Sequence, residues 1–175
     1  FSGDAMADNL KSTTLIYGRF HTRDYEKLSL VPEKSWQLDA TRRLTVKAGA
    51  TYDGTNRDGA VVSPLAEAAI EQALANGGTL RTWLGYAETA QVPDYTALNS
   101  SPTSGLFLGN PALSWETSRN LELGVSVARQ GWKVQTDVFY RKDDNLVDWT
   151  YNSANTAART ANAVDVDTTG FEAFA

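Results

Sequence analysis

The chain has 175 residues, enough for one domain, and its fractions of charged (21%) and hydrophobic (42%) residues fit neither a disordered segment nor a bundle of membrane helices. The net charge of −5 and the pI near 4.9 argue against a surface that binds nucleic acid, because such binding rests on clustered Lys and Arg side chains. Cysteine is absent, which excludes a disulfide framework, a thiolate metal site and a cysteine nucleophile.

A membrane helix is excluded as well, since no stretch approaches about 18 consecutive apolar residues. A membrane β-barrel is not excluded, because alternating strands keep the mean hydropathy low, and here it is −0.36. The chain opens at Phe1 without an initiator methionine or a signal peptide, and the residues from Gly170 onward read as the start of a strand. We therefore expect the sequence to be truncated at both ends.

Alternation of apolar and polar residues, interrupted by turn-forming residues, predicts a chain made of strands. The first hairpin is expected to turn at residues 41–43, which would pair Trp36 with Ala48 on an apolar face. The expected strands cover residues 12–23, 35–40, 44–53, 62–75, 79–92, 116–129, 132–149 and 158–175.

Residues 62–75 are open to two interpretations. Their Ala- and Glu-rich composition, with Pro64 near the start, favours a helix on local propensity. A turn at 76–78, however, would pair this segment with the next strand, for example Ile70 with Leu84, and would bring apolar residues together on one face. Because the neighbouring segments are strands, we expect a strand here, with a helix as the alternative.

The clearest strand pattern lies between Asn120 and Arg141. Apolar residues occupy every second position on both sides of a two-residue turn at Gln130-Gly131. Pairing Arg129 with Trp132 across this turn places the apolar residues of the two strands opposite one another, whereas a slip by one residue would place each opposite a polar residue. The predicted hairpin therefore has one apolar and one mostly polar face.

Short and long connections alternate along the chain, as in outer-membrane barrels with tight periplasmic turns on one rim and long extracellular loops on the other. The short ones are expected at 41–43, 76–78 and 130–131, and the long ones at 24–34, 54–61, 93–115 and 150–157. Trp132 and Tyr140 share a face at a separation of roughly 20 Å along the membrane normal, close to the height of the apolar band. Tyr52, Tyr86 and Trp149 fall near the expected extracellular strand ends, where rings favour the water–lipid boundary, and the alternative for each ring is an ordinary half-buried position in a strand. The pattern predicts an all-β, antiparallel, up-and-down transmembrane β-barrel.

Residues 109–124, which read GNPALSWETSRNLELG, are similar to the segment that leads into a barrel strand of TonB-dependent outer-membrane receptors. Shorter blocks that resemble the same family occur in the family's order, at residues 48–53, 86–98, 138–149 and 167–172. In the second block Gln91 stands where the family usually has arginine. The resemblance spans most of the chain, from residue 44 to residue 174.

This resemblance implies that residues 1–175 are one partial domain, about eight strands from a barrel of about 22 strands, with the plug domain and the C-terminal strands absent. It also implies energised uptake of a scarce small-molecule ligand, such as a metal chelate, a siderophore complex or cobalamin, in the outer membrane of a Gram-negative bacterium. The TonB complex would act on the receptor through the absent plug domain. The sequence does not identify the ligand.

In such a barrel the apolar side chains would face outer-membrane lipid and the polar ones would face the lumen and the plug. The expected lipid-facing residues are Leu121, Leu123, Val125, Val127, Val134 and Val138. The expected lumen-facing residues are Glu122, Ser126, Gln135, Asp137 and Arg141. The loop side chains expected to contact a ligand are Tyr95, Asn99, Trp115, Tyr151 and Asn155, and the alternative for each is a solvated loop residue without such a role.

We expect no catalysis, no metal site and no cofactor. His21 is the only histidine, which disfavours a His-based triad and a multi-histidine metal site. Residues 53–59 resemble a calcium loop only faintly, since Gly54 and Leu65 occupy positions that need acidic ligands. The alternatives are a passive pore or adhesin barrel without energised uptake, and a soluble β-domain enzyme acting on carbohydrates, whose apolar face a second layer would cover.

Overall fold

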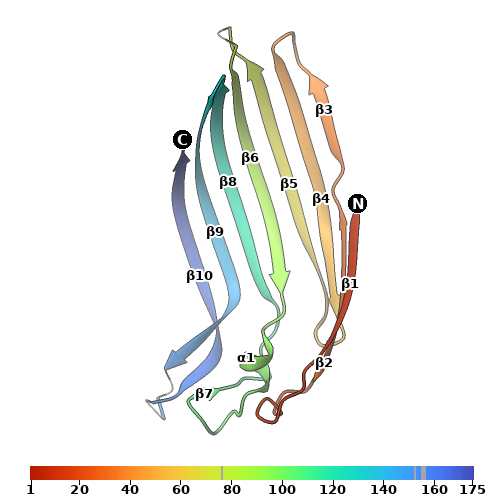
Figure 1. The fold of residues 1–175 in the computed structure, drawn as a ribbon, viewed down its shortest axis with the longest axis vertical. Coiled ribbons are helices and arrows are strands. Elements are labelled where there is room, and N and C mark those ends of the chain that lie inside the picture. The colour runs from red at the N-terminus through yellow and green to blue at the C-terminus, as the bar shows by residue number, and fades with distance from the viewer. Residues whose placement is uncertain (76, 152, 155–156) are drawn as a thin grey trace.

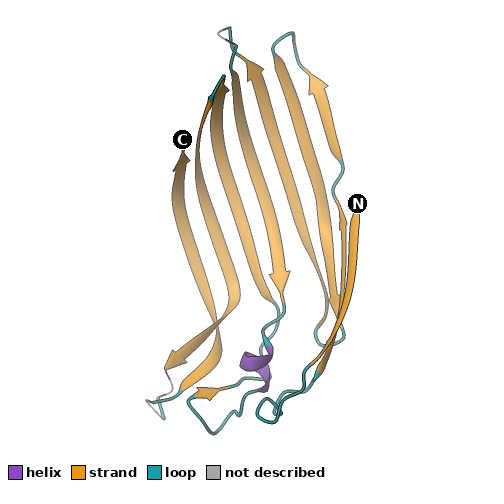
Figure 2. Cartoon of the chain, in the orientation of Figure 1, coloured by secondary structure: helices purple, strands orange, loops and turns teal. Residues whose placement is uncertain are grey.

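The computed structural model describes residues 1–75, 77–151, 153–154 and 157–175. These residues form one curved sheet whose strands run along the length of the molecule (Figure 1). Strands make up nearly all of the regular structure, and the short helix α1 (Tyr95–Asn99) lies at one end of the sheet (Figure 2). The strands are β1 (Ser2–Asn9), β2 (Thr22–Leu30), β3 (Glu33–Gln37), β4 (Arg42–Thr55), β5 (Gly59–Ala73), β6 (Thr79–Gln91), β7 (Phe107–Leu108), β8 (Glu116–Arg129), β9 (Trp132–Tyr151) and β10 (Arg159–Phe174).

Eight strand positions cross the described sheet, whose order is β1-β2-β4-β5-β6-β8-β9-β10-β7 with β3 beside β4. β2 pairs with residues 50–55 of β4 and β3 pairs with residues 43–47, so these two segments share one position. The two-residue β7 runs parallel to the start of β10 and adds no full strand. All other neighbours are antiparallel, and the sheet is open. This confirms the predicted all-β, up-and-down barrel wall of about eight strands.

The hairpin of β8 and β9 has the predicted register. Arg129 pairs with Trp132 beside the turn, and Leu121 pairs with Tyr140 further along. Gly131 adopts a φ of 87°, a conformation that glycine reaches without a steric penalty and that two-residue hairpins require. Turn chemistry and side-chain alternation therefore specify the same pairing.

The register predicted across the first turn is wrong. Trp36 pairs with Leu44 instead of Ala48, a shift of an even number of residues that leaves every side chain on its expected face. The Asp39 carboxylate explains the shift, because it accepts hydrogen bonds from the N–H groups of Thr41 and Arg42, each at 2.9 Å. The bond from Thr41 N–H, followed by that from the Arg42 side chain, holds the pKa of Asp39 well below its usual range.

Residues 62–75 fall largely in β5, which is a strand as expected. β5 pairs with β4 along its whole length and with β6 over residues 65–73. Its glutamates reach across to neighbouring strands: Glu71 pairs with Arg43 at 2.5 Å and Glu67 pairs with Arg81 at 2.6 Å. Pairing on both edges, together with these ion pairs, overrides the local helix propensity.

The pairing of β5 with β6 is displaced by two residues from the prediction. Ile70 lies opposite Thr82 rather than Leu84. The cause is a longer turn, in which the Leu74 N–H donates to the Gly78 carbonyl at 2.8 Å. Again the shift is even, so the apolar and polar faces are those predicted.

The predicted strand 12–23 and the predicted connection 24–34 are both wrong. Residues 10–21 form a loop, and β2 and β3 occupy most of the following segment. Within the loop the Ser12 hydroxyl accepts hydrogen bonds from the N–H groups of Thr14 and Leu15, at 3.1 and 3.0 Å, which bends the chain. The Leu10 N–H donates to the His21 carbonyl at 2.7 Å and closes the loop. Local hydrogen bonds thus take the place of the strand pairing that was expected here.

The sheet sorts its side chains onto two faces. On one face Leu121, Leu123 and Val138 are 47%, 51% and 49% exposed. On the other face the Trp83 Nε1–H donates to Glu122 at 2.8 Å, beside the glutamate–arginine pairs of β5. The residues predicted to face lipid and those predicted to face the lumen therefore lie on opposite faces of the β8–β9 hairpin.

The main cluster of buried apolar side chains lies beside α1, at one end of the sheet. It consists of Ala97, Leu98, Leu113 and Ala161, with Val147 and Trp149 packed against it. Among the described helical residues there is no segment long and apolar enough to cross a membrane.

A glycine on the polar face makes room for the most buried aromatic ring. Trp83 is 6% exposed and lies directly opposite Gly124 on β8. A Cβ added to Gly124 would lie 2.0 Å from the indole ring. A Cβ added to Gly85, two residues from Trp83 and on the same face, would meet no atom within 4 Å.

We predict that Gly124→Ala lowers the free energy of unfolding of the complete barrel by about 1–3 kcal/mol, because the indole ring must shift. Gly85→Ala is the matched control and should change it by less than about 0.5 kcal/mol. Denaturant unfolding in lipid bilayers measures both. Similar losses for the two variants would contradict the packing of Trp83 on Gly124.

Candidate functional site: a loop cluster at one rim

Of the four connections at the end of the sheet that carries α1, three consist entirely of described residues (Figure 1). We call them the loop cluster, which consists of residues 10–21, 56–58 and 92–115. The connections from β3 to β4, from β5 to β6 and from β8 to β9 lie at the opposite end. The connection predicted at 54–61 is shorter than expected, since β4 and β5 extend to within three residues of each other. The predicted long loop at 93–115 is confirmed, but it contains α1 and β7.

Helix α1 anchors the long loop. The Asp94 carboxylate caps the helix by accepting a hydrogen bond from the Ala97 N–H at 2.6 Å. Leu98, on the buried side of the helix, packs with Leu113 and Ala161. This helix was not predicted, although Asp94 directly after a proline is a capping signal that the sequence contains.

Asn99 connects the two larger loops. It is 1% exposed, and its side-chain amide donates to the Phe20 carbonyl at 3.2 Å. Its backbone carbonyl accepts from the Tyr17 N–H at 3.1 Å. Gly18 is required for this approach, because a Cβ there would lie 2.2 Å from the Asn99 side chain. The structure thus gives Asn99 a role inside the loop cluster, and its contact with a ligand stays a prediction.

Tyr95 is held between two strands of the rim. Its hydroxyl donates to the Asp8 carboxylate, and its ring lies 4.5 Å from the guanidinium carbon of Arg23. Arg23 in turn donates to the Pro93 carbonyl at 3.0 Å. Burial, followed by the hydrogen bond to Asp8, raises the pKa of Tyr95 to about 12.

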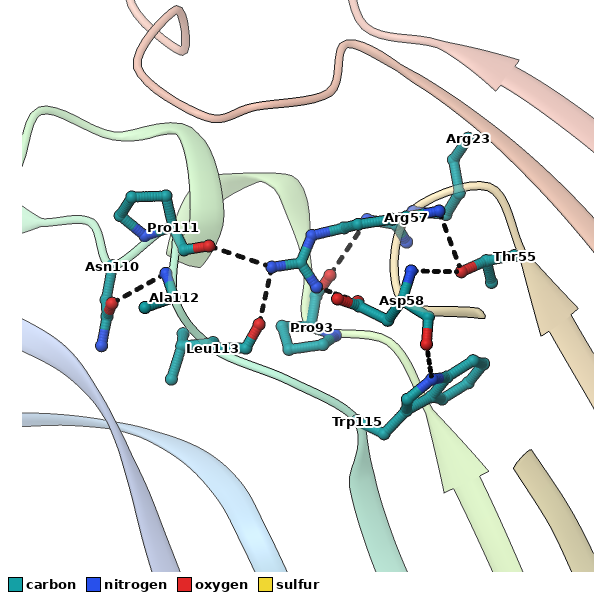
Figure 3. A network of polar contacts seen from close by, with 10 residues as sticks. All are labelled: Arg23, Thr55, Arg57, Asp58, Pro93, Asn110, Pro111, Ala112, Leu113 and Trp115. Atoms are coloured by element: carbon teal, nitrogen blue, oxygen red, sulfur yellow. Dashed lines mark hydrogen bonds and ion pairs between the residues drawn. The ribbon is translucent and has the colours of Figure 1, made fainter. Parts of the chain in front are cut away.

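The turn at 56–58 is joined to the long loop by Arg57, whose side chain is only 8% exposed (Figure 3). Its guanidinium donates to the carbonyls of Leu113, at 2.6 Å, and Pro111, at 3.2 Å, and pairs with the Asp58 carboxylate. The Trp115 indole N–H donates to the Asp58 carbonyl at 3.3 Å. Trp115 is thereby joined to the turn at 56–58, whereas Tyr95 is held by Asp8 and Arg23, and Asn99 by the loop 10–21.

The remaining two predicted ligand residues are placed differently. Tyr151 is 74% exposed and lies at the end of β9, where its ring is 3.7 Å from the guanidinium carbon of Arg159. The nearby β7 contributes Phe107, which packs edge-on against Trp149 with ring centroids 5.2 Å apart. Asn155 lies outside the described residues.

A groove opens between the loops 10–21 and 92–115. Its volume is about 400 Å³, and its walls carry hydroxyl groups and apolar side chains but no charged side chain among the described residues. Tyr17 and Phe107 present rings that are 50% and 55% exposed. The lining residues are Thr13, Thr14, Leu15, Ile16, Tyr17, Ser100, Ser101, Ser104 and Phe107. The sequence had not singled out residues of the first loop, because that segment had been predicted as a strand.

The predicted lumen-facing residues share the polar face. Ser126 and Asp137 are both 7% exposed, and Arg141 pairs with Asp143 at 2.8 Å near the loop end. Beside them a cavity of about 150 Å³ is bounded by Glu116, Arg141 and Asp143, among others. Within the described residues no three His, Cys, Asp or Glu side chains are grouped as a metal site would require. The chemistry of this face is that of ion pairs and hydrogen bonds.

A family model described as "TonB dependent receptor-like, beta-barrel" matches residues 5–175. The chain belongs to this family, whose members are receptors and transporters in the outer membrane of Gram-negative bacteria. The resemblance found in the sequence is confirmed.

Among solved structures, the chain is similar to the siderophore receptor PirA from Pseudomonas aeruginosa, in its crystal structure, with a TM-score of 0.60 and 24% sequence identity. The similarity covers 87% of this chain and 28% of that receptor's chain, so the sequence spans little more than a quarter of the receptor's length. No curated protein matches the chain.

We predict that the Tyr95 hydroxyl stays protonated, and bonded to Asp8, until the pH approaches 12. Its pKa is raised above the unfolded value of 10.0, so the stabilisation is complete below pH 10 and is lost as the pH rises from 10 to about 12. The difference in tyrosinate absorbance between the parent receptor and Tyr95→Phe, followed against pH, isolates this group. A difference that titrates near pH 10 would contradict the contact.

Proposed function

We propose that the complete protein is an outer-membrane receptor that takes up a scarce ligand, such as a metal chelate or cobalamin, with energy delivered by TonB. Residues 1–175 form part of its barrel wall and part of its extracellular capture surface, and they carry no catalytic step. The observation that carries the proposal is the membership of the TonB-dependent receptor family over residues 5–175. The two-faced wall and the loop cluster at one rim support it independently.

The apolar face has the layout of a surface in contact with lipid. On the β8–β9 hairpin, the rows of this face between the turn and the loops pair Val127 with Val134, Val125 with Thr136, Leu123 with Val138 and Leu121 with Tyr140. Thr136 is the one residue of these four rows that is not apolar or aromatic. The next row of this face toward the loops pairs Arg119 with Lys142, and Arg119 also contacts Asp144 at 2.5 Å. An apolar band that ends in aromatic rings and then in charges is typical of the boundary between hydrocarbon and water.

The polar face suits a lumen filled by a plug domain. Its carboxylate and guanidinium groups, such as Glu67 and Arg81, are paired with each other across strands and remain partly exposed. A hydrated interior that contacts a folded plug favours such groups, since charges on a lipid face are costly. Through this plug the TonB complex would act on the receptor.

The loop cluster supplies the chemistry for capture. Its groove combines hydroxyl groups with the exposed rings of Tyr17 and Phe107. Hydroxyl groups orient a ligand by hydrogen bonds, and aromatic rings contribute large contact areas at small cost in conformational entropy. Tyr95, Trp115 and Tyr151 extend the surface, and the loops lie on the rim that would face the outside.

We predict that Val125→Arg destabilises the complete barrel by about 2–4 kcal/mol in a bilayer, because it places a charge in hydrocarbon near mid-membrane, in the row midway between Trp132 and Tyr140. Gln135→Arg, on the neighbouring strand and on the polar face, should cost less than about 1 kcal/mol, since a lumen residue keeps its access to water. Equilibrium refolding into lipid vesicles compares the two. Equal losses of unfolding free energy in the two variants would contradict the proposal that one face of the wall meets lipid and the other meets the lumen.

We predict that the full-length receptor accumulates at least one member of a panel of radiolabelled ferric siderophores and cobalamin in cells that lack other receptors for them. Accumulation should disappear when TonB is deleted, because uptake against a gradient needs energy. For the ligand that is taken up, Tyr17→Ala should weaken cell-surface binding by about tenfold, or ~1.4 kcal/mol, through loss of the ring.

Leu106→Ala is the control for that variant, since Leu106 is 63% exposed next to Phe107 but does not line the groove. It should leave binding unchanged. Accumulation that is equal with and without TonB would favour the passive pore instead. Equal effects of the two variants on cell-surface binding would mean that the groove is not part of the capture surface, and they would not contradict the proposed receptor function.

A further inference from the structure

We propose that Arg57 is a positioning residue that fixes the segment 109–115 onto the turn between β4 and β5. Its guanidinium orders this segment before any ligand binds, and it does so in addition to the contacts by which α1 anchors the rest of the long loop. The inference concerns the order of the loop and does not depend on which ligand, if any, the groove takes.

The two carbonyl groups that Arg57 binds have no hydrogen-bond partner within the described sheet. Pro111 and Leu113 precede β8, so their carbonyls lie outside the ladder of the sheet. Leu113 is 5% exposed, and a backbone carbonyl in such surroundings needs a partner other than bulk water. The guanidinium of Arg57 supplies hydrogen bonds to both, at 3.2 and 2.6 Å.

The loop holds these two carbonyls in a fixed conformation. The Asn110 side chain accepts a hydrogen bond from the Ala112 N–H at 3.0 Å, and the Asn110 carbonyl accepts from the Leu113 N–H at 3.3 Å. The Asn110 N–H donates to the Ala97 carbonyl at 2.7 Å, which joins the segment to α1. The asparagine–proline pair therefore shapes a small turn, and Arg57 closes it from the outside.

Arg57 is itself held in place by Thr55, the last residue of β4. The Thr55 hydroxyl accepts hydrogen bonds from the N–H groups of Arg57, at 3.3 Å, and Asp58, at 3.2 Å. The Asp58 carboxylate neutralises the guanidinium, and the Asp58 carbonyl accepts from the Trp115 indole (Figure 3). Contacts thus run in both directions between the turn and the loop.

The chemistry requires an arginine. A planar guanidinium can serve two carbonyls and a carboxylate at once, whereas a lysine ammonium is a shorter-reaching point charge with a different geometry. A side chain without charge would leave Asp58 unpaired and both carbonyls without their donor. Removing the guanidinium should therefore release the segment without disturbing the wall, because neither carbonyl is part of the ladder.

The experiment uses the full-length receptor in lipid bilayers without ligand. Residues 1–175 contain no cysteine, so after removal of any cysteine elsewhere a nitroxide can be attached at Ala112→Cys, which is exposed, or at Lys133→Cys on β9. In Arg57→Met the mobile fraction of the spectrum at position 112 should rise several-fold, and in Arg57→Lys it should rise less. The spectrum at position 133 should not change in either variant.

Arg43→Met is the matched control, because Arg43 also forms an ion pair, with Glu71, but at the opposite end of the wall. It should leave the label at position 112 immobile. An unchanged spectrum at 112 in Arg57→Met would overturn the proposal, and so would equal mobilisation at 112 and 133, which would mean a general loosening of the barrel. Since no ligand is present, a failed uptake assay and a failed labelling result remain distinguishable.

Discussion

The hydrogen-bond ladder of a single sheet is the constraint on which the rest of this structure depends. The wall strands between the two edges pair through their backbone groups within the plane of the sheet, so successive side chains must point to opposite sides. A wall of one layer then has two faces that meet two different surroundings. The apolar face around Leu123 and Val138 needs a medium without water, and the ion-paired face around Glu67 and Arg81 needs one with water or polar groups.

Beyond the rim the ladder ends, and side chains form hydrogen bonds with the backbone groups of the loops. Asp94 satisfies the start of α1, Asn99 joins the loops 10–21 and 92–115, and Arg57 binds two free carbonyls of the segment before β8. Asp94 acts within its own segment, whereas Asn99 and Arg57 each bond a backbone carbonyl from a distant part of the chain. A loop built in this way can present aromatic rings such as that of Tyr95 in a defined position, as a capture surface requires.

The parts of the fold that were predicted correctly are those in which local pattern and turn chemistry agree. The β8–β9 hairpin has both a strict alternation and a two-residue turn with glycine, and its register followed directly. The first turn lacked such a signal, because the hydrogen bonds of Asp39 could be recognised only with the chain in place. The loop at 10–21 was mistaken for a strand, since a short segment forms a strand only where a partner pairs with it, and in the described sheet no strand pairs with this segment.

The candidate site was predictable only in outline. The long loop 92–115 and its family-like segment were visible in the sequence, and so were Tyr95, Asn99 and Trp115 as residues of interest. The residues that assemble the site were not, because Arg57 is separated from Leu113 by many residues and no periodicity relates them. The groove depends on the same kind of contact, between loops that are distant in the chain.

By itself, the sequence determined that this protein is built of strands, which side chains share a face, and to which family it belongs, because alternation and motif order are properties of neighbouring residues. Tertiary structure alone decided the registers at the longer turns and the assembly of the loop cluster, and it decided between the expected strand and the alternative helix at residues 62–75. These depend on hydrogen bonds and ion pairs between residues far apart in the chain, whose free energy appears only once the sheet has brought them together.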